Sequence, residues 1–171
     1  MAKTNRRSML RVAAGSGAVL FAAPSFFAAP PRPRQQRARP DPLASALVND
    51  FVRVAHSDLD ATRQMLHQEP RLIKATWDWG GGDFETAIGA AGHMGRRDIA
   101  GFLLDNGAAI DLFVAAMLGR LAVVGAALEG QPSLFHVPGP HGIPLVAHAR
   151  AGGEQAAAVL DFLNDFEASV G

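Results

Sequence analysis

Residues 86–109 of the chain, TAIGAAGHMGRRDIAGFLLDNGAA, place their apolar side chains in two short helical blocks. Gly95 separates the blocks, and Asn106-Gly107 ends the second one. Because Asn and Gly tolerate the left-handed conformation that terminates a helix, this order predicts a helix-turn-helix unit. One such pair cannot bury its own apolar face, whereas pairs stacked side by side form a continuous core. The segment therefore predicts a stacked array of helix pairs.

The same order of small, apolar and glycine residues recurs in residues 112–128 and 143–163. Eighteen Gly, eleven Pro and no Tyr in 171 residues indicate many short elements separated by turns. We therefore predict an all-α solenoid of about four helix-turn-helix repeats in residues 43–171. The first helix of the array is expected where apolar residues follow helical spacing, at Leu43, Leu47, Phe51 and Val54.

The stretch TAIGAAGHMGRRDIAGFLLDNGAAID resembles the ankyrin repeat and aligns with its pattern without a gap. Gly89 stands where that family has His. The residues at the turn between the two helices of each repeat are expected to be Ser57, Gly95, Gly119 and Gly152, and only the last step equals the family's period of about 33 residues. The short step from Gly95 to Gly119 predicts a third repeat without the usual β-hairpin finger. The matching positions are Thr86, Ile88, Ala91, Gly95, Asp98, Ile99, Leu103, Leu104, Gly107 and Ala108.

The resemblance implies that the concave face, formed by finger tips and first helices, binds another protein. In the ankyrin family the residues before the turn glycine commonly face the partner. The positions of this chain that correspond to them are His93, Met94, Met117, Leu118, Arg150 and Ala151.

Both tryptophans of the chain lie in the stretch ATWDWGGGDFET, next to three acidic residues. Trp supplies a large contact area at a low entropic cost, so a glycine-containing finger of this kind is typical of a protein-recognition surface. Alternatively, one or both indoles cover the core between the first two repeats, since Trp is well buried on average. The candidate partner-binding residues of this finger are Trp77, Asp78, Trp79, Asp83 and Glu85.

The first 29 residues are expected to be an export signal. Arg6-Arg7, followed by the uncharged residues 12–29, resembles the twin-arginine signal of bacteria. Residues 30–42, rich in Pro and Arg, are expected to form a disordered linker. Ala23-Pro24-Ser25 is the best candidate cleavage site. If cleavage does not occur, residues 12–29 are long enough to act as a marginal membrane tether.

The distribution of charge argues against nucleic acid as a partner. Eight of the sixteen Lys and Arg residues precede Asp41, whereas all sixteen acidic residues lie from Asp41 onward, so residues 41–171 carry a net charge of −8. Nucleic-acid binding requires clustered positive charge. The absence of Cys excludes disulfides, thiolate nucleophiles and cysteine-ligated metal centres.

The histidine-rich stretch HVPGPHGIPLVAHA does not predict a metal site. Prolines separate His136, His141 and His148, and no Cys or carboxylate lies nearby in the sequence. We expect His148 to form a hydrogen bond within the stack. A hydrolase site at His136 and His141 would lack an acid–base pair, and Gly80-Gly81-Gly82 lacks the features of a phosphate loop. No metal, cofactor or enzymatic activity is therefore predicted.

These observations predict an exported, periplasmic or envelope-located module that binds a protein on the concave face of an ankyrin-type stack. The alternative is a structural accessory protein of the cell envelope, tethered to the membrane by an uncleaved signal, whose cationic linker meets anionic lipid.

Overall fold

A computed structural model describes residues 40–170 of the chain. The expected export signal, with Arg6 and Arg7, and residues 30–39 of the expected linker lie outside this range.

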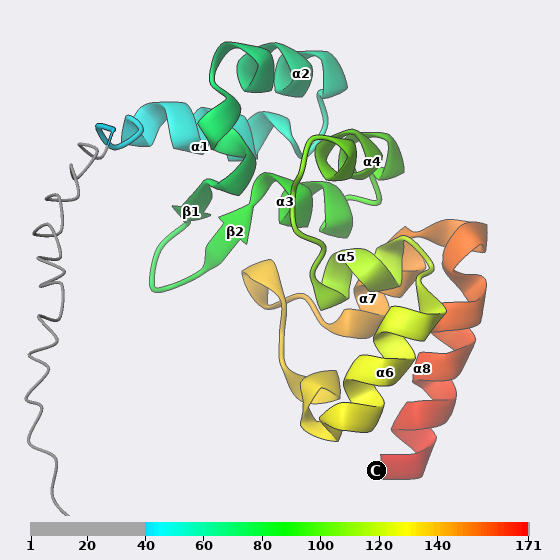
Figure 1. The fold of residues 1–171 in the computed structure, drawn as a ribbon. Coiled ribbons are helices and arrows are strands. Elements are labelled where there is room, and N and C mark those ends of the chain that lie inside the picture. Colours follow the sequence, from blue (N-terminus) through cyan, green and yellow to red (C-terminus); the bar gives the residue numbers. More distant parts are fainter. Residues whose placement is uncertain (1–39, 171) are drawn as a thin grey trace, which may run out of the picture. The chain divides into compact units, whose positions relative to one another are not determined.

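The described part is mostly helical and contains eight α-helices, four short 3₁₀ helices and one β-hairpin (Figure 1). The α-helices follow one another as four pairs. They are α1 (Ser45–Val54) with α2 (Leu59–Gln68), α3 (Ala87–His93) with α4 (Arg97–Asp105), α5 (Leu112–Met117) with α6 (Leu121–Gly130), and α7 (Leu145–Ala151) with α8 (Ala157–Val170). The 3₁₀ helices are η1 (Pro70–Lys74), η2 (Pro132–His136), η3 (Pro140–Gly142) and η4 (Gly153–Ala156).

Side-chain caps explain where three of the helices begin. The carboxylate of Asp58 accepts a hydrogen bond of 2.9 Å from the Ala61 amide at the start of α2, and Asp111 accepts one of 2.7 Å from Val114 at the start of α5. Thr86 Oγ1 accepts a bond of 3.1 Å from the amide of Gly89 at the start of α3. Each cap satisfies an amide that has no partner within its helix.

The predicted helix pair within residues 86–109 is confirmed by α3 and α4. Gly95, in the turn between them, has φ +67°, and Gly107, after α4, has φ +92°. Residues with a Cβ rarely adopt these angles. A Cβ at Gly95 would also lie 2.5 Å from the carbonyl oxygen of Ala151, so the backbones of the second and fourth pairs approach closely here.

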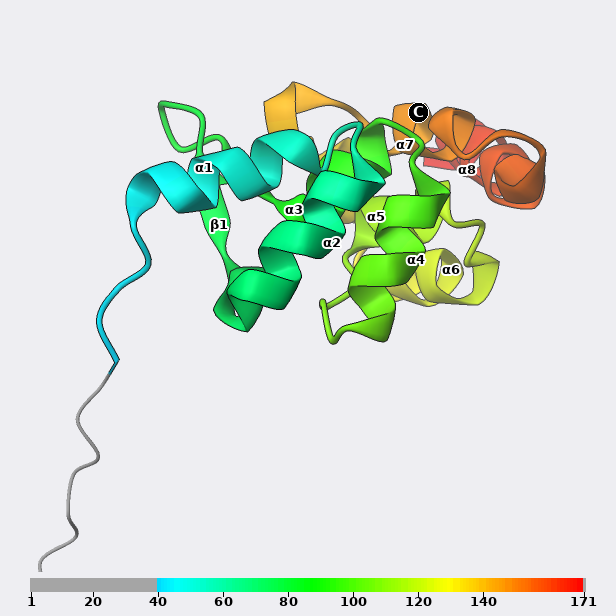
Figure 2. The same cartoon turned by 90° about the horizontal axis from the view of Figure 1, so that it is seen from above.

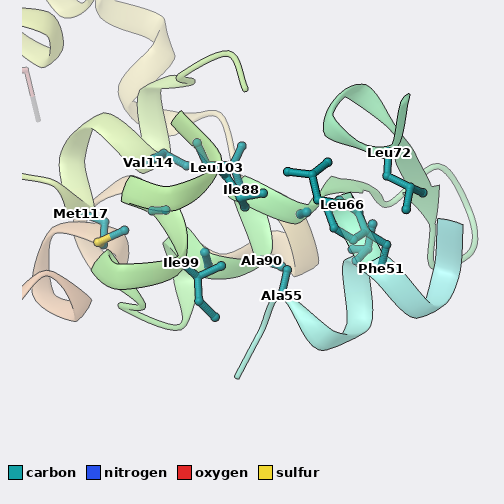
Figure 3. Packing of buried hydrophobic residues seen from close by; sticks show 14 residues of the cluster. Phe51, Ala55, Leu66, Leu72, Ile88, Ala90, Ile99, Leu103, Val114 and Met117 are labelled. Atoms are coloured by element: carbon teal, nitrogen blue, oxygen red, sulfur yellow. The ribbon is translucent and has the colours of Figure 1, made fainter. Parts of the chain in front are cut away.

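Helices α1, α3, α5 and α7 pack in this order, each against the next, and α7 additionally contacts α3. In a strictly linear array α5 would separate α3 from α7. The buried residues form two clusters, one between α1 and α5 (Figure 3) and one between α5 and α8. Helix α5 contributes to both: Val114 and Met117 belong to the first, Ala115 and Ala116 to the second. Helix α5 thus lies between the two clusters, and the contact of α7 with α3 places the fourth helix pair close to the second.

A two-stranded antiparallel hairpin, β1 (Thr76–Asp78) and β2 (Phe84–Thr86), precedes α3, and Trp77 pairs with Glu85 in its register. Asp78 Oδ1 accepts hydrogen bonds from the amides of Gly80 (2.9 Å) and Gly82 (3.2 Å), which closes the hairpin tip. No strand lies between α4 and α5 in the described part of the chain, as the short repeat spacing predicts. Figures 1 and 2 show the hairpin tip and the segment at residues 137–142 on the same side of α3.

Candidate functional site

Glu85 lies at the centre of a polar cluster beneath the hairpin. Successive residues of a strand point to opposite faces, so β2 exposes Phe84 and buries Glu85. Glu85 is 1% exposed, and its Oε2 accepts a hydrogen bond of 2.8 Å from the indole Nε1 of Trp79. The expectation that Glu85 faces a protein partner is therefore wrong, because the alternation of the strand turns its side chain inward.

Three histidines surround this carboxylate. His93, the last residue of α3, places Nε2 2.9 Å from Glu85 Oε1. His56, in the turn between α1 and α2, and His141, in η3, each place Nε2 3.4 Å from Glu85 Oε2. We call His56, Glu85, His93 and His141 the histidine–glutamate cluster. One nitrogen or oxygen from each of these residues lies within 4.8 Å of the others.

The opposite ring nitrogens of two of these histidines contact fixed acceptors. His56 Nδ1 lies 3.0 Å from the carbonyl oxygen of Val52, and His141 Nδ1 lies 2.8 Å from Asp83 Oδ2. Because a carbonyl and a carboxylate oxygen can only accept, Nδ1 carries the proton in both rings. In the neutral form of each ring, Nε2 therefore presents a lone pair toward Glu85.

The surroundings hold both carboxylates in their charged form. Burial alone would raise the pKa of Glu85, but the contact with His93, the hydrogen bond from Trp79 and the nearby imidazoles lower it below its usual value. The pKa of Asp83 is also lowered, chiefly by the hydrogen bond from the backbone amide of His141. The cluster therefore places a buried anion among three imidazoles.

His141 adopts an unusual backbone conformation. Its φ of +58° is the only positive φ of a non-glycine residue in residues 40–170. Both oxygens of Asp83 hold it, since Oδ1 accepts from the His141 amide at 2.9 Å and Oδ2 contacts the ring. A strained backbone persists only where its surroundings fix it, and such residues concentrate at functional sites.

The other finger residues divide between core and surface. Trp77 is half-buried and packs against the first hydrophobic cluster, whereas Trp79 is 38% exposed with its N–H bonded to Glu85. Asp78 is exposed and stabilises the hairpin tip, and Asp83 is half-buried against His141. The two tryptophans thus take different roles.

The residues expected to face a partner at the inter-helix turns also differ in their exposure to solvent. Met94, Arg150 and Ala151 are exposed. Leu118 is half-buried, and His93 points into the histidine–glutamate cluster.

Met117 is completely buried in the first hydrophobic cluster. Its expected contact with a partner is therefore wrong, since α5 packs on both sides and turns this side chain into the core.

A surface depression of about 350 Å³ lies between the hairpin and the segment that leads to η3. Its lining includes the aromatic rings of Phe84 and Phe113 together with Pro138, Gly139 and Pro140. Phe84 is 62% exposed, the highest fraction among the exposed large apolar residues in the described part of the chain. A depression of this size can accept an apolar side chain from another molecule.

The cluster is not apparent in the sequence, because the histidines nearest to His141 in the chain are not its members. His136 and His148 do not belong to it, and the carboxylate that completes it comes from the hairpin, more than fifty residues earlier. One signal was present: His56 and His93 lie in or next to the turns that follow α1 and α3, and these two helices pack against each other.

No helix within residues 40–170 is long and apolar enough to cross a membrane. No protein-family model matches the chain, and no similar curated protein or solved structure is found.

Proposed function

We propose that residues 43–171 form an ankyrin-type stack of four helix pairs that binds another protein through its finger segments. These segments, which precede the first helices of the second, third and fourth pairs, are residues 76–86, 106–111 and 137–144. Support for the stack comes from the packing of α1, α3, α5 and α7 in order and from the ankyrin-like sequence of α3 and α4.

The single observation that carries the binding proposal is the exposure of Phe84 beside the depression that it lines with Phe113. Large apolar side chains that stay exposed next to a concavity are typical of interaction sites, because a partner removes them from water. Trp79, Ile110 and Val137 are also exposed and lie in finger segments. The exposed apolar surface is therefore enriched where ankyrin-type proteins bind their partners.

Met94 extends this surface to the turn between α3 and α4, where it is 51% exposed. Its neighbour His93 points inward, so Met94 is the residue of this turn that is available to a partner. Arg150, exposed near the end of α7, supplies a positive charge on a domain whose net charge is −8. The proposed binding surface consists of Trp79, Phe84, Met94, Ile110, Val137 and Arg150.

Affinity capture with the full chain as bait, from cells that naturally produce it, tests this proposal. The test variant combines Phe84→Ser with Met94→Ser, and its circular dichroism spectrum must match that of the wild type. The control combines Leu121→Ser with Val123→Ser, which removes exposed apolar residues of α6 outside the finger segments. A protein captured by the wild type and the control but not by the test variant supports the proposal. Equal capture by all three chains, or no capture by the wild type, contradicts it.

We also propose that the chain is exported. This proposal rests on Arg6-Arg7 and the uncharged residues that follow them.

A further inference from the structure

We propose that the histidine–glutamate cluster binds one divalent transition-metal ion, with Zn²⁺ as the best fit. The ligands would be Nε2 of His56, His93 and His141 and one carboxylate oxygen of Glu85. This inference is independent of the proposed protein-binding surface and concerns side chains below it.

The distances suit a small tetrahedral site. Zn–N and Zn–O bonds of about 2.0–2.2 Å at tetrahedral angles place ligand atoms about 3.3–3.6 Å apart. His93 Nε2 lies 2.9 Å from Glu85 Oε1, whereas His56 Nε2 and His141 Nε2 each lie 3.4 Å from Oε2. One ligand atom from each of the four residues lies within 4.8 Å of the others. Movements of about 1 Å, which side-chain rotation supplies, therefore bring four donors around one ion.

Two buried atoms of the cluster lack a hydrogen-bond partner. Glu85 Oε1 and His93 Nε2 are inaccessible to solvent and, although only 2.9 Å apart, do not meet hydrogen-bond geometry with each other or with another described residue. An unsatisfied buried polar atom is costly, and native structures rarely keep one without a reason. A metal ion beside the line between these two atoms would satisfy both.

The outer contacts are those expected of metal-ligating histidines. Such histidines usually donate their other ring N–H to a carboxylate or a backbone carbonyl, which fixes the tautomer and the ring orientation. His141 donates to Asp83, and His56 donates to the Val52 carbonyl. Both arrangements leave the Nε2 lone pair directed into the cluster, where it is required for coordination.

The donor set selects the class of metal. Three imidazoles and one carboxylate suit Zn²⁺, Co²⁺, Ni²⁺ and Cu²⁺, whereas Mg²⁺ and Ca²⁺ prefer oxygen ligands throughout. The ion also compensates the buried negative charge of Glu85. The side chains of His56 and His141 are 21% and 32% exposed, so an ion reaches the site from solvent without unfolding of the domain.

Four protein ligands complete a tetrahedral shell, which is the pattern of a structural rather than a catalytic zinc site. The ligands come from the α1–α2 turn, the hairpin, the end of α3 and the η3 segment. The ion therefore connects the first, second and fourth helix pairs, which is the arrangement that α7 permits by packing against α3. Its expected effect is to stabilise the fold.

Titration of the full, untagged, metal-stripped chain with Co²⁺ and Zn²⁺ tests the inference. Tetrahedral Co²⁺ gives intense visible absorption, so the expected result is one equivalent of Co²⁺ bound with this spectrum and displaced by one equivalent of Zn²⁺. In calorimetry we expect Zn²⁺ binding to weaken at least tenfold in His141→Gln and in His93→Gln. The matched controls are His67→Gln and His136→Gln, which remove histidines outside the cluster and should bind Zn²⁺ as the wild type does.

Thermal unfolding keeps the test decisive if His93→Gln fails to fold. His141 lies on a surface segment, so His141→Gln is the variant most suited to keep its structure. Zn²⁺ should raise the Tm of the wild type and of His136→Gln by several degrees and that of His141→Gln by much less. The inference is overturned if the wild type binds no stoichiometric Co²⁺ or Zn²⁺, or if binding and Tm shift are the same in His141→Gln as in the wild type.

Discussion

Asp83 and His141 are 58 residues apart in the sequence, yet Asp83 Oδ2 lies 2.8 Å from His141 Nδ1 and Asp83 Oδ1 accepts a 2.9 Å hydrogen bond from the His141 amide. This double contact joins the tip of the hairpin to η3. It holds the histidine at a positive φ and directs Nε2 toward Glu85. The contact therefore links the hairpin to a ligand of the proposed metal site.

Replacing Asp83 by Ala should release this connection. The His141 amide and ring then lose their acceptor, and the backbone of η3 loses the contact that maintains its conformation. We expect a lower Tm and broadened amide resonances at residues 140–142 in NMR spectra. Asp161→Ala, at an exposed position of α8 with no ion-pair partner among residues 40–170, is the control. Unchanged resonances at residues 140–142 in Asp83→Ala would show that the contact does not hold this segment.

Alanine substitutions at Gly95 and Gly107 should differ in cost. Both residues have positive φ, which costs a residue with a Cβ about 1–2 kcal/mol. At Gly107 the added Cβ has no neighbour within 4 Å, whereas at Gly95 it would lie 2.5 Å from the Ala151 carbonyl oxygen. Gly95→Ala should therefore destabilise the domain by about 1–3 kcal/mol more than Gly107→Ala does. Urea unfolding measures both, and equal losses would argue against the close approach of the second and fourth helix pairs.

Acid should destabilise the domain through His148. Burial of this side chain lowers its pKa below the usual 6.5, so it stays neutral in the folded state while it takes up a proton in the unfolded chain. Its contribution to stability is complete above pH 6.5 and is lost as the pH falls toward the folded pKa.

The His148→Gln variant isolates this effect. The free energy of unfolding, measured by urea at several pH values, should fall less steeply below pH 6.5 in the variant than in the wild type. The same slope in both chains would mean that His148 titrates alike in the folded and unfolded states.

Export should depend on the arginine pair near the start of the chain. The twin-arginine resemblance predicts that replacing Arg6 and Arg7 together by Lys retains the chain in the cytoplasm, because the export machinery recognises the pair itself. Fractionation of cells with an antibody against the chain measures this. Arg11→Lys is the control, and undiminished export of the double variant would contradict the twin-arginine prediction.

Local signals in the sequence were sufficient to predict the helix pair in residues 86–109. The apolar spacing, the turn at Gly95 and the end at Asn106-Gly107 act within a few residues of each helix, and the structure places α3 and α4 on either side of Gly95. The absence of a hairpin between α4 and α5 could be predicted from spacing alone, since residues 106–111 are too few to form one.

The cluster could not be predicted in the same way, because its members meet only through tertiary packing. His141 reaches Glu85 because α7 lies against α3 as well as α5, a contact that a linear repeat pattern does not contain. The orientation of Glu85 depends on the register of a three-residue strand, where a shift of one residue would exchange it with Phe84. The position of Met117 before a turn glycine predicts exposure, but α5 packs between two hydrophobic clusters, and the first of them buries this side chain.

Photo-crosslinking in the cells that produce the chain tests the central claim, that the finger segments bind a protein, most directly. A photoreactive phenylalanine analogue is placed at Phe84 in one chain and, as a control, at Val123, an exposed apolar residue of α6 outside the finger segments. The account predicts a discrete crosslinked product with a second protein from position 84 and none from position 123. The same products from both positions, or no product from position 84, would contradict it.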